Sequence, residues 1–326
     1  AAHRMRERAA GRAATEHFRP LGQDMNGNGA SELQGCSISL SAMGTTVAIG
    51  ALIKAGATSN AGFPLRVYRV DGTAWAQLGN DIEEANGMTA DGMALSGDGA
   101  TLVVGDKTAH NCRVFQLNGA SWAQLAQPVS GEAGGDLSCQ RVALSADGTT
   151  LGVGASGDDS TGKLVSRFRV YRLSGTQWVQ LGPQIVGEAV ASPSSMSVAL
   201  SADGSTIALG TLLDDATSRC RIYRLNIEDT VWVQLGHDVI KGEAVAYLTG
   251  FDTALSADGT KVAISTHVSN KINYRASQLH VYMLSGAAWV QLGRGIDGSS
   301  WGEQSSISVG VGADDATTLA VAASMV

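Results

Sequence analysis

Charged residues and long apolar runs are both scarce in this chain of 326 residues. Charged residues make up 16% of it and hydrophobic residues 44%, so the composition gives no case for intrinsic disorder. The longest apolar runs, such as residues 319–323, are far shorter than the roughly 18 residues that a membrane-spanning helix needs. We therefore expect a soluble protein or soluble ectodomain with no transmembrane segment.

Motifs of familiar enzyme chemistry are missing as well. The six histidines never fall at a metal-binding spacing, no Gly-x-Ser-x-Gly elbow occurs, and no glycine-rich loop opens a helix. The sequence therefore predicts no catalytic residue, no metal site and no cofactor, and it favours a protein that is not an enzyme.

Net charge is −7, with a pI near 5.3, and it is unevenly distributed. The first 19 residues carry +3, which leaves −10 on the remainder. An acidic body repels phosphate backbones, so we expect no nucleic-acid partner. Residues 1–17 are rich in Ala and Arg and are interpreted as an N-terminal extension, which is a solvated tail, a helix or a transit-peptide remnant.

The chain does contain a repeat of about 50 residues, a period typical of repeat architectures. A turn of the form Ser-Ala-Asp-Gly, or a variant of it, recurs at spacings of 55, 49, 56 and 55 residues, at Ser41, Ser96, Ser145, Ser201 and Ser256. Tryptophan keeps the same period at Trp75, Trp122, Trp178, Trp232 and Trp289. A sixth, degenerate copy follows Val311, and Phe18–Gly22 matches the Trp segment.

Each copy predicts four short strands. In the fourth copy they are residues 197–200, 206–210, 221–225 and 232–235, which are rich in β-branched or aromatic residues and bounded by turn residues. Dipeptides such as Asp71-Gly72 supply the positive φ angles of two-residue hairpins, so neighbouring strands are antiparallel. Residues 47–50 are apolar on both faces of their strand, so both faces must be covered. The pattern predicts an all-β fold, a β-propeller of four-stranded antiparallel blades.

Two families share parts of this pattern. Kelch and galactose-oxidase-like propellers share one order of motifs with this chain. A Gly-Ala pair comes first and Arg-Val-Tyr-Arg-Leu follows, and Trp lies seven residues after the Tyr, as from Tyr171 to Trp178. The chain resembles those propellers in this order. Residues 35–51 (GCSISLSAMGTTVAIGA) and their copies resemble the FG-GAP repeats of integrin-type propellers. The kelch Gly-Gly doublet and the FG-GAP calcium loop Asp-x-Asp-x-Asp-Gly are both absent from this sequence. The resemblance therefore does not imply a calcium-binding site.

The resemblance and the repeat together predict one propeller domain over residues 18–326. Five blades are complete, near residues 35–83, 89–129, 138–186, 194–240 and 249–297. We expect a sixth blade, closed between residues 306–324 and residues 18–23, and the alternative is a fragment of a seven-bladed ring. The five column tryptophans are expected to be core.

The four cysteines show no paired or metal-like spacing. Cys112 and Cys220 occupy one position two copies apart, which in a ring is much farther than the roughly 7 Å between the Cα atoms of a disulfide. We therefore expect the cysteines to be small buried apolar residues without a disulfide.

Candidate binding residues cluster at one predicted face. The connections from second to third strand and from blade to blade emerge at this face and differ in length and content. Binding residues concentrate in loops on rigid scaffolds. The loop after the Trp strand repeatedly offers an acid, at Glu84, Glu132, Glu188 and Glu243. Trp301 lies outside the Trp column in the last such loop, while Arg141 and Asp252 are expected to line the central channel. Each of these residues also has a structural alternative. The four glutamates would be solvated or would cap turns, Trp301 would fill the closure of the ring, and Arg141 and Asp252 would form a structural pair in the channel.

We expect a non-enzymatic binding or scaffold module that recognises a protein or glycan partner through these loops. The alternative is a secreted polysaccharide hydrolase or lyase, in which acids such as Glu132 and Glu188 would converge on one pocket. A third interpretation is that the propeller is one structural domain in the array of a longer cell-surface protein. The family resemblance implies an extracellular or cell-surface location.

Overall fold

The structure is a computed structural model in which the described residues form strands and turns. Among them, none belongs to a helix that could cross a membrane. It describes residue 23 and residues 32–53, 65–82, 92–106, 109–131, 137–158, 162–190, 196–212, 218–241, 251–269, 275–297, 307–311 and 319–323. The predicted extension, residues 1–17, lies outside this set.

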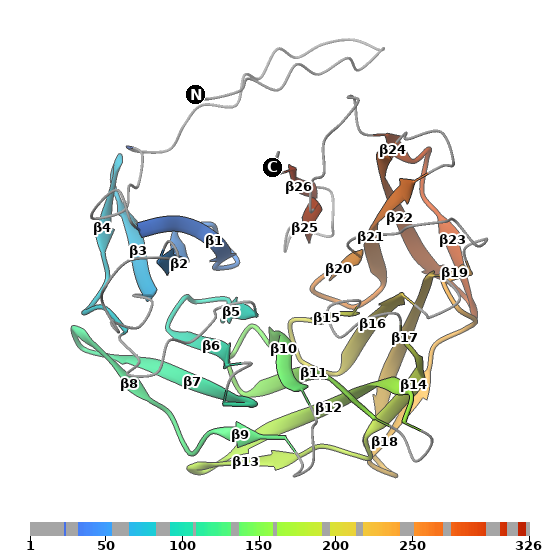
Figure 1. The fold of residues 1–326 in the computed structure, drawn as a ribbon, viewed down its shortest axis with the longest axis horizontal. Helices are drawn as coiled ribbons and strands as arrows, with labels where there is room; N and C mark the ends of the chain where they lie inside the picture. Colours follow the sequence, from blue (N-terminus) through green and yellow to red (C-terminus); the bar gives the residue numbers. More distant parts are fainter. Residues whose placement is uncertain are drawn as a thin grey trace.

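Five antiparallel sheets stand radially around a central axis, each with its first strand innermost and its fourth strand outermost (Figure 1). Blade 1 consists of β1 (Glu32–Leu40), β2 (Thr46–Ile53), β3 (Leu65–Asp71) and β4 (Ala74–Gln77). Blade 2 consists of β5 (Met93–Leu95), β6 (Thr101–Asp106), β7 (Asn111–Asn118), β8 (Ser121–Gln124) and a short β9 (Val129–Ser130).

The next three blades repeat this order, and each also has a short fifth strand that pairs with its third. Blade 3 consists of β10 (Leu137–Leu144), β11 (Thr150–Asp158), β12 (Leu164–Ser174), β13 (Gln177–Gln180) and β14 (Ile185–Ala189). Blade 4 consists of β15 (Met196–Leu200), β16 (Thr206–Leu212), β17 (Ser218–Asn226), β18 (Val231–Gln234) and β19 (Ile240–Lys241). Blade 5 consists of β20 (Phe251–Leu255), β21 (Lys261–Ser269), β22 (Arg275–Ser285), β23 (Ala288–Gln291) and β24 (Ile296–Asp297).

The four-stranded antiparallel blade is confirmed, but the expectation of six blades is wrong. The described residues form five blades, and the last copy forms only a two-stranded sheet of β25 (Ile307–Val311) and β26 (Leu319–Ala323). Within the described residues β26 pairs only with β25, and no segment like the Arg-Val-Tyr-Arg-Leu third strand of blade 3 lies beside it. A repeat of the inner two strands is therefore not enough to make a blade.

Apolar side chains cover both faces of the sheets, as the sequence predicts. Between blades 1 and 2, Ala48 and Val67 of the first pack with Leu102 and Val104 of the second, and all four side chains are fully buried. Equivalent clusters fill the next junctions. Burial of apolar surface between neighbouring sheets therefore stabilises the packing of each blade on the next.

A chain of backbone hydrogen bonds links the Ser-x-Asp-Gly turns of consecutive blades. The amide of Ala42 donates to Gly97 O, Gly97 to Ala146 O, Ala146 to Ala202 O, and Ala202 to Ala257 O, at 2.8 to 3.0 Å. The links run from blade 1 to blade 5 without a break. The repeated turn is thus an inter-blade connector as well as a hairpin.

Side chains fix the shape of each of these turns. In blade 5, Ser256 Oγ donates to Asp258 at 2.6 Å and accepts from the Lys261 amide at 2.9 Å, while Thr260 donates to Asp258 from its amide and its hydroxyl. Burial alone would raise the pKa of Asp258, but these hydrogen bonds outweigh it and lower the pKa to about 2. The pKa values of Asp147 and Asp203 are lowered in the same way.

The tryptophans join the outer parts of neighbouring blades. Trp122 is buried, and its indole Nε1 donates to Leu78 O of the preceding blade at 2.7 Å. Trp232 and Trp289 make the same contact with the preceding blade at 2.9 Å. Trp75, in the first blade, instead exchanges backbone hydrogen bonds with the side chain of Gln23. The prediction that the column tryptophans are core residues holds fully for Trp122 alone, since the other four are partly buried.

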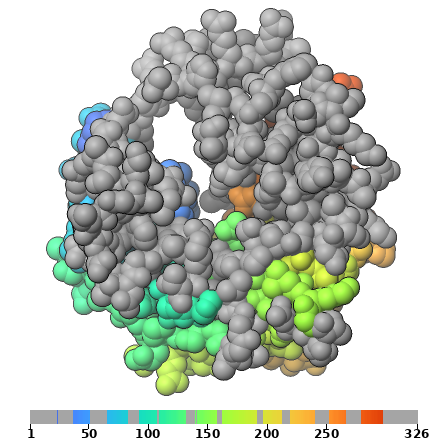
Figure 2. All heavy atoms as spheres, in the orientation of Figure 1, coloured from blue at the N-terminus to red at the C-terminus, as the bar shows by residue number. Residues whose placement is uncertain are grey.

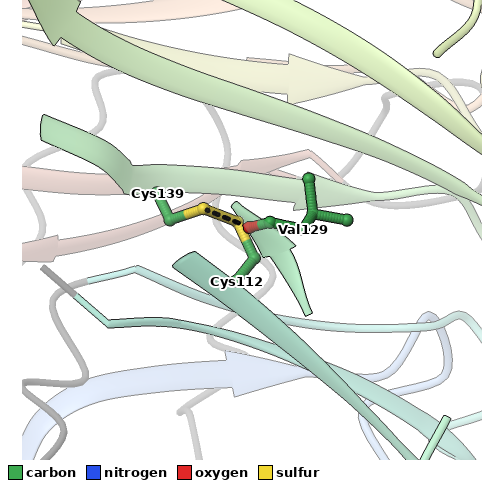
Figure 3. The surroundings of a disulfide bond; sticks show 3 residues. All are labelled: Cys112, Val129 and Cys139. Atoms are coloured by element: carbon green, nitrogen blue, oxygen red, sulfur yellow. Dashed lines mark hydrogen bonds between the residues drawn. A yellow bond between two sulfur atoms is a disulfide. The ribbon is translucent and has the colours of Figure 1, made fainter. Parts of the chain in front are cut away.

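The expectation that the cysteines form no disulfide is wrong. Cys112 on β7 and Cys139 on β10 are joined by a disulfide, with their Cα atoms 5.5 Å apart (Figure 3). Cys112 and Cys220 are two blades apart, but Cys139 lies in the blade adjacent to Cys112, within reach of its sulfur. Cys220 is buried and free, as expected.

Candidate functional site

The strand ends form two different faces. The first and third strands of each blade end in short hairpin turns, and we call that side the turn face. On the opposite side, the loop face, the second strands lead to the third strands and the blades lead to one another. Residues 54–64 separate β2 from β3, whereas only residues 107–110 separate β6 from β7. Figure 2 shows an opening near the centre of the ring, bordered in part by atoms coloured as blades 1, 3 and 5.

Arg141 and Asp252 lie on the innermost strands β10 and β20, on either side of β15. Arg141 Nε donates to Met196 O of β15 at 3.0 Å, which ties blade 3 to blade 4. Asp252 Oδ1 accepts from the amide of Thr253 at 3.0 Å, and the hydroxyls of Thr253 and Ser197 are 2.9 Å apart. Arg141 therefore contacts β15 directly, whereas blade 5 contacts β15 through Thr253, the neighbour of Asp252.

Glu188, on β14, is held in an ion-pair cluster at the junction of blades 3 and 4. Its Oε1 lies 2.5 Å from Arg219 Nη1 and 2.7 Å from Arg221 Nη2. Asp238 completes the cluster, with Oδ1 2.9 Å from Arg221 Nε. Burial alone would lower the pKa of Arg221, but the hydrogen bonds to Asp238 and Glu188 raise it well above its usual value. The two acids and two arginines balance one another, so Glu188 is not a free acid.

Blade 1 contains an ion pair at the positions equivalent to Arg221 and Asp238. Arg66 Nε lies 3.0 Å from Asp81 Oδ2, and the Arg66 side chain is only 7% exposed. In blade 5 the arginine is replaced by His280 and the acid by Gly295, on which a Cβ would meet the His280 ring at 2.6 Å. In blades 2 and 3 the arginine is kept as Arg113 and Arg169, while the acid position holds Pro128 and Gln184. The acid of this pair is therefore not a constant part of the repeat.

Sequence reasoning missed Arg219, Arg221 and Asp238. A signal for two of them was present, because the Arg of Arg-x-Tyr-Arg and the acid two residues after Leu-Gly recur together in blades 1 and 4. The other acids of the predicted set, Glu84, Glu132 and Glu243, and also Trp301, lie outside the described residues.

An open groove of about 430 Å³ lies between the outer parts of blades 1 and 2. It is lined by Asn80, Asp81, Ile82, Phe115 and Trp122. The two aromatic side chains expose little surface, at 6% and 7%, and Asn80 Oδ1 already accepts from the Trp122 amide at 3.0 Å. Asp81 is likewise bonded, to Arg66 and Gln77 of blade 1, so the polar groups of the groove already have partners and form no built ligand site.

Metal chemistry has no support in the described part of the chain, where no group of three or more His, Cys, Asp or Glu side chains could hold an ion.

Comparisons with known proteins give the fold. No family model matches the sequence, and no curated protein is similar to it, so the resemblance to FG-GAP and kelch repeats stays a prediction. Hydrazine synthase from Kuenenia stuttgartiensis is similar with a TM-score of 0.56 at 13% identity, over 93% of this chain and 77% of that chain. A putative TolB from Agrobacterium tumefaciens gives 0.47 at 13%, over 90% and 91%. A putative 6-phosphogluconolactonase from Bacteroides uniformis gives 0.49 at 12%, over 87% and 87%. At such identities likeness shows the fold alone, and the radial sheets make the chain a β-propeller.

Proposed function

We propose that this β-propeller is a non-enzymatic binding module that recognises a protein or glycan partner through its loop face. The observation that carries the proposal is the difference between the two faces. The turn face is built from repeated short turns whose backbone groups bond to one another from blade to blade. The loop face carries the connections that differ in length and sequence from blade to blade.

Rigidity of the scaffold supports the proposal. The blades are fixed to one another by apolar clusters, by the turn-to-turn hydrogen bonds and by the Trp contacts. Loops on such a scaffold keep their ends in place, which reduces the entropy lost on binding. A ring of this kind can therefore present variable residues in fixed relative positions.

Enzymatic hydrolysis of a polysaccharide gains no support from the described residues. That alternative needs two carboxylates to converge, and Glu188 is one of the two acids named for it. Its carboxylate contacts Arg219 and Arg221, so it is held as an ion pair at a blade junction. This carboxylate is therefore engaged by two arginines, and the other acid named for catalysis, Glu132, lies outside the described residues.

Binding of the immobilised full chain to a glycan array and to proteins of its native extract tests the proposal. Chemical cross-linking and mass spectrometry then locate each retained partner on the chain. Loop-face variants are Trp301→Ala and the pair Arg141→Gln with Asp252→Asn. Asp71→Asn, in an exposed turn on the opposite face, is the matched control. Melting curves show that each variant is folded.

A partner that the native chain and the Asp71 variant retain, and that a loop-face variant loses, supports the proposal. Cross-links confined to the turn face contradict it. Failure to retain either a protein or a glycan also contradicts it and favours catalysis.

A further inference from the structure

The junction of blades 2 and 3 is built differently from the other described junctions. It contains the disulfide of Cys112 and Cys139, the one disulfide among the described residues. The pairing of β10 with β11 shifts register between Leu137 and Arg141, so the backbone bulges around Cys139. The disulfide therefore anchors an irregular segment at the loop-face end of an innermost strand.

The backbone of Cys139 is strained. Its φ angle is 68°, in the left-handed region that residues with a Cβ rarely adopt. The bulge also pushes its carbonyl oxygen against β6, where a Cβ on Gly105 would lie only 1.9 Å from that oxygen. Only glycine fits at position 105. The surroundings thus hold Cys139 in a conformation that it would leave if released.

Contacts between the two blades do not depend on the disulfide alone. Val103 and Val114 of blade 2 pack with Val142, Leu151 and Val153 of blade 3 in one buried cluster. Cys112 and Cys139 belong to the same cluster, but its other members are apolar side chains whose contacts need no disulfide. Cleavage of the disulfide would leave the apolar junction in place.

We propose that the Cys112–Cys139 disulfide is a redox-dependent clamp on the loop-face end of the blade 2 and blade 3 junction. In the oxidised state it holds the strained bulge against Gly105. In the reduced state the bulge relaxes and residues 129–131 and 137–141 loosen, while the five blades stay folded. The clamp does not depend on the proposed binding function.

The chemistry is thiol–disulfide exchange with a dithiol. One thiolate of the dithiol attacks a protein sulfur and breaks the S–S bond, and the second thiolate then resolves the mixed disulfide. Two electrons pass to the protein, both cysteines leave as thiols, and the dithiol becomes a disulfide. Val129 O, 3.8 Å from Cys139 Sγ, is in place to accept a hydrogen bond from the new thiol (Figure 3). The reverse reaction needs a disulfide oxidant.

Both sulfurs are shielded, because Cys112 is 0% exposed and Cys139 is 1% exposed. An attacking thiolate must wait for the junction to open, so exchange in the folded protein is slow. The state of the clamp therefore reflects sustained redox conditions, and the oxidised state fits an oxidising compartment.

Hydrogen exchange measured by mass spectrometry on the full chain tests the clamp. The samples are the oxidised protein, the protein reduced by dithiothreitol, the variant with Cys112→Ser and Cys139→Ser, and Cys220→Ser as the matched control for loss of a buried cysteine. We expect peptides over residues 129–144 to exchange about tenfold faster or more after reduction, because their local opening becomes easier. Peptides over β16–β17 and β21–β22 should be unchanged, and the Cys220 variant should behave as the oxidised protein.

Three results would overturn the proposal. One is a non-reducing digest of the oxidised protein that yields no cross-linked peptide containing Cys112 and Cys139. Another is equal exchange in residues 129–144 before and after reduction. The last is faster exchange in all five blades, which would make the disulfide a condition of folding and not a local clamp. The reduced native sequence keeps the test valid if the double variant fails to fold.

Discussion

Gly204, in the Ser-x-Asp-Gly turn of blade 4, offers a sharp test of how tightly the blades meet. Its φ angle is 68°, and a Cβ built on it would lie 2.6 Å from the Cβ of Thr150 in blade 3, which is fully buried. Gly175, in the turn between β12 and β13, has a φ of 60° with nothing within 4 Å of such a Cβ. Both sites require a left-handed backbone, but only Gly204 lies against a neighbouring blade.

Substitution by Ala at the two sites separates these effects. Each variant places an Ala in the left-handed region, which costs about 1–2 kcal/mol, and each changes the entropy of the unfolded chain equally. Gly204→Ala must also displace Thr150, and overpacking of this kind costs about 1–3 kcal/mol more. We therefore expect a loss of about 1–2 kcal/mol for Gly175→Ala and about 2–5 kcal/mol for Gly204→Ala.

Urea unfolding followed by tryptophan fluorescence and by circular dichroism gives the two free energies of unfolding. The difference between the variants isolates the contact between blades. Equal losses in the two variants would refute the argument that the glycine of the repeated turn is required by the neighbouring threonine.

Three further predictions rest on single contacts. Because the folded-state pKa of Asp258 is about 2, below its ordinary value of 3.8, its contribution to stability is complete above about pH 4 and is lost as the pH falls through about 2. Asp258→Asn should flatten this part of the stability curve in acid titrations of the urea midpoint, and an unchanged curve would contradict the assignment. Trp122→Phe should cost about 2–4 kcal/mol, since it removes indole volume and leaves Leu78 O without its donor, and a urea midpoint equal to that of the native chain would contradict it. Burial, reinforced by a nearby carboxylate, raises the pKa of the Cys220 thiol, so iodoacetamide should modify it only at the rate of unfolding, and rapid labelling of the folded chain would contradict this.

Local features of the fold could be predicted from the sequence. The strands expected at residues 197–200, 206–210, 221–225 and 232–235 correspond to β15, β16, β17 and β18, with ends within three residues. Alternating apolar residues and glycine-containing turns are read along the chain, so these strands need no knowledge of their neighbours. The short strands β9, β14, β19 and β24 were missed, because two to five residues carry too little pattern.

The candidate site could be predicted only in part. Glu188 was chosen for its place after the Trp strand, yet its chemistry is set by Arg219 and Arg221 of the next blade. Arg141 and Asp252 lie on innermost strands as expected, but the contacts of Arg141 and of Thr253, the neighbour of Asp252, with β15 came only from the structure. The predicted binding roles of all these residues stay predictions.

The sequence by itself determined the repeat, the order of strands in each blade, the antiparallel hairpins and the need to cover both faces of every sheet. All of these depend on residues close together in the chain. Only the tertiary structure decided that the described residues form five blades, that Cys112 pairs with Cys139, and that the turn glycines of blades 2 to 5 each meet a threonine of the preceding blade. These features depend on how tightly neighbouring copies approach across the ring, and that distance is set by the packing of side chains far apart in the sequence.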